Sequence, residues 1–115
     1  GQGIKMKAML KRIVDIIEDK KGEQTVVLDI SEISSLADFF VISSANNINQ
    51  LQAISDDLQD VLEKEGLEIR KVEGAKNSTW VLLDCSDIVI HLFTKEDRIF
   101  YNLERIWADA KQIEL

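Results

Sequence analysis

The histidine and the cysteine of this 115-residue sequence are its most reactive side chains, and each type occurs once. Cys85 and His91 lie on neighbouring apolar segments that are joined by Ser86 and Asp87. A thiol beside an imidazole could act as a nucleophile, because the base removes the proton from the attacking sulfur. The flanking residues supply neither an oxyanion loop nor a group that orients the base. We therefore interpret Cys85 as a small buried hydrophobic residue and His91 as a packed, hydrogen-bonded core residue.

Paired carboxylates are the second arrangement that could do chemistry, at Asp84 with Asp87 and at Asp56 with Asp57. The first pair flanks a short turn and could bind a cation, although aspartates in turns usually accept hydrogen bonds from backbone amides. The second pair points in different directions on an expected helix, as is typical of a solvated surface. Zinc requires more Cys and His ligands than this chain has, and no glycine-rich phosphate loop occurs. We expect no metal, no cofactor and no catalytic centre.

The charge balance points to a protein partner rather than a nucleic acid. Lys and Arg number 14 against 21 Asp and Glu, which gives a net charge of −7. Such a surface should repel DNA and bare RNA, whose binding depends on basic side chains. The same field attracts a basic protein, although acidic residues can equally serve solubility alone. No apolar run is long enough to span a membrane and no secretion signal is evident, so we expect a cytoplasmic protein.

Helices and strands that could position these side chains alternate along the sequence. With 45% hydrophobic and 30% charged residues, the chain is expected to fold as one domain over residues 1–115, with 1–3 a loose terminus or tag remnant. Hydrophobic spacing predicts helices over 4–20, 47–65 and 94–110. Short apolar runs predict strands over 24–30, 39–43, 67–72, 80–85 and 88–93. A capping box at Thr94 and Asp97 should start the last helix.

This order, α-β-β-α-β-β-β-α, predicts an α/β (α+β) domain in which helices flank a single mixed sheet of about five strands. The strand–helix–strand succession 39–72 favours a parallel crossover, and the short later turns favour antiparallel hairpins. Strands 80–85 and 88–93 are almost continuously apolar, so both of their faces must be covered. Helices of the chain, a partner protein or a second copy could provide that cover. Trp80 and His91 suit an interface anchor, with Arg98 and Tyr101 at its rim.

Several segments together resemble one family, and they are Val26–Ile30 with Ser34–Ile42, Val72–Gly74, Trp80–Asp84, Asp87–Phe93 and Arg98–Trp107. Their order and spacing over about residues 5–107 are similar to the ribosomal silencing factor family, also called the Iojap family. The resemblance implies a non-enzymatic repressor of translation that binds the large ribosomal subunit through ribosomal protein uL-fourteen and blocks subunit joining. It also implies a fold that is similar to the nucleotidyltransferase superfold in shape only.

The resemblance further implies which positions contact the partner, and these are Glu73, Trp80, Asp84, Asp87, His91, Arg98 and Tyr101. Trp80 would be the anchor, and the acidic residues would meet Lys or Arg. Each of these residues also has a structural interpretation, in which the aspartates hold the hairpin and the aromatic rings pack. The chain departs from the family at Ser86, where glycine is usual, and at Asn46–Asn49.

Two other functions remain open from the sequence. A nucleotidyltransferase-like enzyme would use Asp38, which follows Ser34 and Ser35, but the paired acids of that class are missing. A homodimer is suggested by the broad apolar stripe of the helix predicted over 4–20, and it is compatible with the silencing function.

Overall fold

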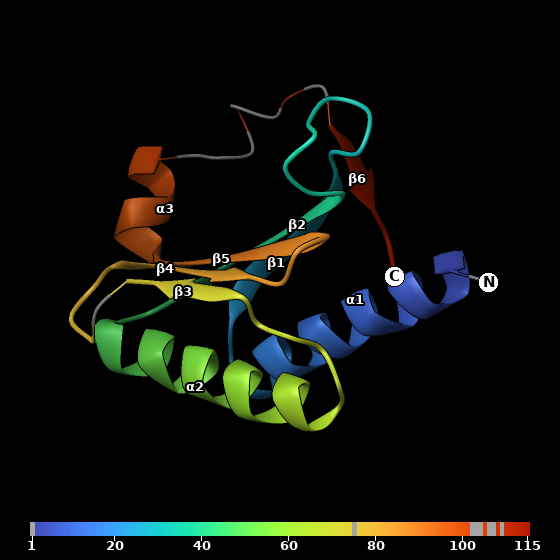
Figure 1. Ribbon diagram of the computed structural model, residues 1–115. Helices are drawn as coiled ribbons and strands as arrows, with labels where there is room; N and C mark the ends of the chain where they lie inside the picture. Colours follow the sequence, from blue (N-terminus) through green and yellow to red (C-terminus); the bar gives the residue numbers. More distant parts are fainter. Residues whose placement is uncertain (1, 75, 102–104, 106–107, 109) are drawn as a thin grey trace.

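The described residues form three layers, with two helices on one side of a six-stranded sheet and a third helix on the other side (Figure 1). The computed structural model describes residues 2–74, 76–101, 105, 108 and 110–115. The sheet contains parallel and antiparallel neighbours, which confirms the predicted class. It has one strand more than the five or so that the sequence indicates, and this strand is the last element of the chain.

The sheet is arranged around one central parallel pair. Its order is β3-β4-β5-β2-β1-β6, and among the strands of the described residues only β2 and β5 are parallel neighbours. β3 is antiparallel to β4 and β4 is antiparallel to β5, so β3 runs in the same direction as β5 and its parallel neighbour β2. The connection from β2 through α2 to β3 is therefore a parallel crossover, as expected, but β4 and β5 lie between the two strands in the sheet. The strand bounds are Glu23–Asp29 (β1), Phe39–Ala45 (β2), Lys71–Glu73 (β3), Trp80–Asp84 (β4), Ile88–Thr94 (β5) and Lys111–Ile113 (β6).

Two long helices cover one face of the sheet. They are α1 (Gln2–Asp19) and α2 (Ile48–Lys64), and they pack against each other beneath the strands (Figure 1). Asn47 caps α2, because its side chain accepts a hydrogen bond of 2.8 Å from the amide of Gln50. The apolar stripes of both helices are buried against alternate residues of the strands, and this layer holds the larger hydrophobic core.

The predicted strand 67–72 is too long at its start. Gly66, with φ at +90°, ends α2, and the amide of Leu67 still bonds the carbonyl of Leu62. Leu67 and Ile69 then pack against the core as irregular chain. Pairing with β4 therefore begins only at Lys71.

The end of the chain also differs from its prediction. The third helix, α3 (Lys95–Tyr101), begins where expected, but the remainder of the predicted helix lies largely outside the described residues. The capping box is wrong, because Asp97 accepts a hydrogen bond from the hydroxyl of Thr79 and the amide of Thr94 bonds the Thr79 carbonyl. Both bonds tie the start of α3 to the start of β4.

Candidate protein interface

Side-chain alternation on β4 and β5 divides their residues between the two faces of the sheet. One set points into the core between the sheet and helices α1 and α2, and it consists of Val81, Leu83, Ile88, Ile90 and Leu92. The intervening residues point to the opposite face, which we call the α3 face because α3 lies on it (Figure 1). Its members form a second hydrophobic cluster, which includes Leu28, Phe40, Ile42, Trp80, Val89 and Phe93.

An aromatic group that includes His91 lies at the centre of the α3 face. Trp80 stacks on Phe93, with ring centroids 5.2 Å apart and planes inclined by 21°. Phe40 meets the imidazole of His91 edge-on at a centroid distance of 4.7 Å. Cross-strand pairing accounts for the group, because Trp80 lies opposite Phe93 on β4 and β5.

A hydrogen bond fixes how the indole and the imidazole are oriented. Nε1 of Trp80 donates to Nδ1 of His91 over 3.2 Å. His91 is only 5% exposed, and burial lowers the pKa of its imidazole to about 4. The ring is therefore neutral at pH 7, and its proton lies on Nε2 because Nδ1 is an acceptor. The expectation that this histidine is packed and hydrogen-bonded is confirmed.

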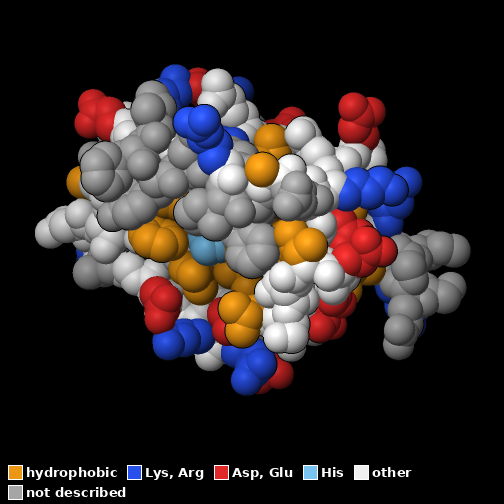
Figure 2. Space-filling model, turned by 90° about the horizontal axis from the view of Figure 1, so that it is seen from above, with side chains coloured by type: hydrophobic (Ala, Val, Ile, Leu, Met, Phe, Trp, Pro, Cys, Tyr) orange, Lys and Arg blue, Asp and Glu red, His pale blue; other side chains and the backbone are white. Residues whose placement is uncertain are grey.

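The second ring nitrogen of His91, Nε2, differs from Nδ1 in its hydrogen bonding. It is buried and has no hydrogen-bond partner among the residues that the structure describes. Figure 2 looks onto the α3 face and shows hydrophobic side chains gathered around the histidine, with charged side chains toward the margin. A buried donor without an acceptor costs free energy.

Two predicted acidic contacts lie at the β3 edge of the same face. Glu73 is opposite Leu82, and Asp84 is opposite Lys71 and Val89, so both alternate onto the side of Trp80. Glu73 forms an exposed ion pair of 2.8 Å with Lys71. The structure thus brings Glu73, Trp80, Asp84 and His91 onto one face.

Asp84 also has the structural role that was the alternative interpretation. Its carboxylate accepts a hydrogen bond of 2.9 Å from the amide of Ser86. Ser86 adopts φ of +74°, a left-handed conformation that explains why glycine is usual there. A side chain in this conformation costs about 1 kcal/mol. Asp84 compensates by holding the turn.

Nothing in the described contacts joins the other predicted contacts to this group. Arg98 is 9% exposed, and its guanidinium approaches the Ser44 hydroxyl at 3.5 Å and the Glu23 carbonyl at 3.4 Å, which joins α3 to the sheet. Asp87 immediately precedes β5, and its carbonyl accepts hydrogen bonds from the amides of Asp38 and Phe39. The side chain of Tyr101 lies outside the described residues. Their contact roles stay predictions.

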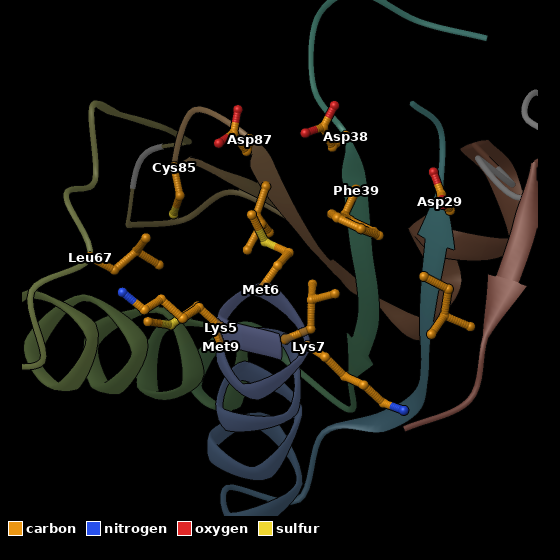
Figure 3. A pocket seen from close by; sticks show the side chains of 13 residues that line it. Lys5, Met6, Lys7, Met9, Asp29, Asp38, Phe39, Leu67, Cys85 and Asp87 are labelled. Atoms are coloured by element: carbon orange, nitrogen blue, oxygen red, sulfur yellow. The ribbon is translucent and has the colours of Figure 1, made fainter. Parts of the chain in front are cut away.

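A cavity of about 660 Å³ opens on the opposite side, between α1 and the sheet (Figure 3). Met6, Met9 and Phe39 contribute apolar walls, and Asp38 and Asp87 stand at the starts of β2 and β5. Cys85 also lines this cavity, so it lies on the face opposite to His91.

The sulfur of Cys85 does not suit nucleophilic chemistry. Burial raises the pKa of the Cys85 thiol to about 11, with a smaller contribution from the charge of Asp84, so the thiol stays protonated at neutral pH. His91 cannot act as its base because the sheet separates the two side chains. Within the described part of the chain, no three His, Cys, Asp or Glu side chains are grouped to hold a metal ion. None of the described helices is both long and apolar enough to cross a membrane.

Two aromatic members of the α3 face were not among the predicted contacts. Phe40 and Phe93 complete the surroundings of His91. Phe93 could have been found from the sequence, because it is two residues after His91 and therefore on the same strand face. Phe40 could not, because its place depends on the parallel pairing of β2 with β5.

Comparison with known proteins identifies the family of the chain. A family model described as "Ribosomal silencing factor during starvation" matches residues 4–115. The relative "Ribosomal silencing factor RsfS" of Halalkalibacterium halodurans is 44% identical over 107 residues, covering 93% of this chain and 92% of the relative. The protein of the same name in Bacillus subtilis is 38% identical over 109 residues, covering 95% and 92%. "Protein Iojap, chloroplastic" of Arabidopsis thaliana is 35% identical over 108 residues, covering 94% of this chain and 45% of that protein.

Solved structures agree with this result. A crystal structure from Bacillus halodurans superposes with a TM-score of 0.83 at 40% identity, covering 95% of this chain and 99% of that one. A second, from Chromobacterium violaceum, gives a TM-score of 0.85 at 28% identity, covering 89% and 85%. The match over nearly the whole sequence and the shared fold together show that this chain belongs to the ribosomal silencing factor family.

Proposed function

We propose that this chain binds the large ribosomal subunit through ribosomal protein uL-fourteen and blocks joining of the small subunit. It thereby represses translation in the cytoplasm without catalysing a reaction. Membership of the ribosomal silencing factor family supports a ribosomal partner. The observation that carries the proposal is the α3 face, where aromatic side chains and a buried imidazole adjoin acidic residues.

The chemistry of the α3 face suits a basic protein. Half-buried Trp80 provides a rigid apolar anchor at its centre, which is the kind of residue that dominates binding energy at interfaces. Glu73 and Asp84 at the edge would attract Lys and Arg and would repel ribosomal RNA phosphates. A standard interface takes about 800 Å² from each partner. The domain, with extents of 38 × 33 × 23 Å, could supply this area and still obstruct a second subunit.

The nucleotidyltransferase-like alternative has less support. It would use Asp38, which lies beside Asp87 where β2 and β5 begin. Two-metal phosphoryl transfer needs several carboxylates that converge on the ions. The described residues offer no such group of three.

Binding to isolated large subunits tests the proposal. The wild-type chain should co-sediment with them in a low-salt gradient, and in a joining assay it should reduce formation of complete ribosomes. Trp80→Ala should weaken binding by about 30-fold, since loss of an interface anchor costs ~2 kcal/mol or more. Thermal unfolding of the variant verifies that its fold is retained.

A charge reversal provides a second, matched comparison. Glu73→Lys should weaken binding by several-fold, because it reverses an acidic group at the edge of the α3 face. Glu63→Lys makes the same change at an exposed position of α2, on the other side of the sheet, and should bind as the wild type does. If the wild-type chain stays at the top of the gradient, the proposal is wrong.

A further inference from the structure

The cavity between α1 and the sheet has no part in the proposed function. Its volume of about 660 Å³ falls within the range of about 300–1,000 Å³ that is typical of sites for small organic molecules (Figure 3). Protein interiors are otherwise close-packed, so a hollow of this size beside the larger hydrophobic core needs an explanation. The sheet separates the cavity from the α3 face, so a ligand here would bind independently of that surface.

The walls of the cavity are mainly apolar and come from a helix, three strands and the chain after α2. Met6 and Met9 of α1 are the two methionines of the sequence, and both line the cavity. Methionine is flexible and polarisable, so its side chain adapts to the outline of an apolar molecule. An occupant should therefore have an apolar body, which gains free energy by leaving water. The other apolar walls are Leu10, Phe39, Leu67, Ile88 and Ile113.

Two carboxylates, which we call the carboxylate pair, stand at one end of this apolar space (Figure 3). They belong to Asp38 and Asp87, which immediately precede the parallel neighbours β2 and β5. The Asp87 carbonyl accepts a hydrogen bond of 2.8 Å from the amide of Asp38, which holds the two residues side by side. Among the described residues, no hydrogen bond or ion pair satisfies either carboxylate. Two like charges held in this way favour a cation beside them.

The other charged residues that line the cavity do not neutralise this end. Asp29 is also acidic, and hydrogen bonds from the hydroxyl and the amide of Ser31 lower the pKa of its carboxyl, so it is ionised at neutral pH. Lys5 and Lys7 lie on α1, and Figure 3 shows their ammonium groups directed to either side and not toward the carboxylate pair. A cationic group is therefore attracted to this end of the cavity, and an anionic group is repelled.

We propose that this cavity binds a small organic cation. The apolar body of the ligand lies against Met6, Met9 and Phe39, and its protonated amine lies beside the carboxylate pair. The net charge of −7 favours a ligand of the same sign over the whole molecule. An anionic molecule of equal size is excluded by charge and not by shape.

The two methionines report directly on occupancy of the cavity. In protein labelled with ¹³C at the methionine methyl groups, the chain gives two NMR signals, and both come from the cavity walls. Three probes share an indole ring and differ in charge, namely tryptamine (a cation), tryptophol (neutral) and indole-3-acetate (an anion). Tryptamine should shift both signals in a saturable way. Tryptophol should bind about 3-fold more weakly and indole-3-acetate about 10-fold more weakly.

Substitutions that remove charge without changing shape test the carboxylate pair. Asp38→Asn and Asp87→Asn keep the backbone hydrogen bonds, and each should weaken tryptamine binding by about 2- to 5-fold, as expected for one exposed charge. The double variant should bind tryptamine about 5- to 20-fold more weakly but should bind uncharged tryptophol as the wild type does. Asp56→Asn makes the same change at an exposed position of α2 outside the cavity and should leave tryptamine binding unchanged. Thermal unfolding of every variant verifies folding.

Three results would overturn the proposal. The first is the absence of a saturable shift of the Met6 and Met9 signals with tryptamine. The second is equal binding of the three probes to the wild type, a comparison that does not depend on whether any variant folds. The third is wild-type affinity for tryptamine in a folded double variant. None of these measurements uses ribosomal subunits, so the proposed function and this proposal can fail separately.

Discussion

At the scale of single residues, His91 orients the aromatic group of the α3 face. Its Nδ1 accepts the indole hydrogen of Trp80, and its buried Nε2 has no hydrogen-bond partner among the described residues. The bond with Trp80 needs the neutral ring, since a protonated imidazole has no acceptor for the indole. Burial, which keeps the ring neutral, therefore makes this part of the fold sensitive to acid.

Stability should fall in mild acid because of this residue. Burial lowers the pKa of folded His91 to about 4, whereas an unfolded histidine titrates near 6.5. The unfolded state therefore binds the proton first, so the stabilising contribution is complete above pH 6.5 and is lost as the pH falls toward 4. Between pH 7 and pH 5 the free energy of unfolding should decrease by about 2 kcal/mol.

Urea unfolding at the two pH values measures this loss, with His91→Phe as the reference. Carboxylates contribute to both proteins, so their effect cancels in the comparison. The variant should show the smaller decrease, and equal decreases would contradict a buried neutral imidazole.

At the scale of elements, the turn between β3 and β4 positions Trp80. Gly74 leaves β3 with φ of +110°, and a Cβ atom there would lie 2.6 Å from the carbonyl oxygen of Trp80. The turn can form only because this residue has no side chain. Gly66, after α2, has φ of +90° but open space around it.

The two glycines make a matched pair of substitutions. Gly66→Ala should cost about 1 kcal/mol from backbone strain alone. Gly74→Ala should cost about 2–4 kcal/mol, because the methyl group also displaces the start of β4. Chemical unfolding measures both values, and only Gly74→Ala should weaken binding to large subunits. Equal costs would show that the contact with the Trp80 backbone is unimportant.

Whether a strand could be predicted from the sequence depends on what stabilises it. Strands β2, β4 and β5 could be predicted because each is a strongly apolar run that is buried in the sheet. The three residues of β6 are mostly polar and become a strand only through pairing with β1, a partner distant in the sequence.

Some residues of the candidate site could likewise be predicted from the sequence, and others could not. Trp80 and His91 could be predicted from their residue types and from the apolar strands that carry them. The burial of Arg98 could not, because it depends on where α3 packs relative to Ser44. Long-range packing has no local sequence signal.

At the scale of the whole molecule, the net charge of −7 acts on any approaching partner. Opposite charges accelerate the encounter of two proteins, and dissolved salt screens this attraction. The apolar centre of the α3 face should instead determine how slowly the complex dissociates.

Salt should therefore act mainly on the association rate. Between ~50 and ~300 mM KCl the association rate with large subunits should fall by about 10-fold, with little change in dissociation. Stopped-flow or surface-immobilised subunits can measure both rates. Glu73→Lys should reduce the salt dependence more than Glu63→Lys does. A salt effect confined to dissociation would argue against steering by acidic residues.

The two outermost strands, β3 and β6, have three residues each, whereas the strands between them have five to seven. An incoming peptide that tried to extend the sheet would find only a few backbone groups to pair with at either border. Lateral strand addition and fibril-like stacking are thus both disfavoured. A protein built in this way can accumulate without self-association through its borders, and it must recognise others by side chains instead of by main-chain pairing.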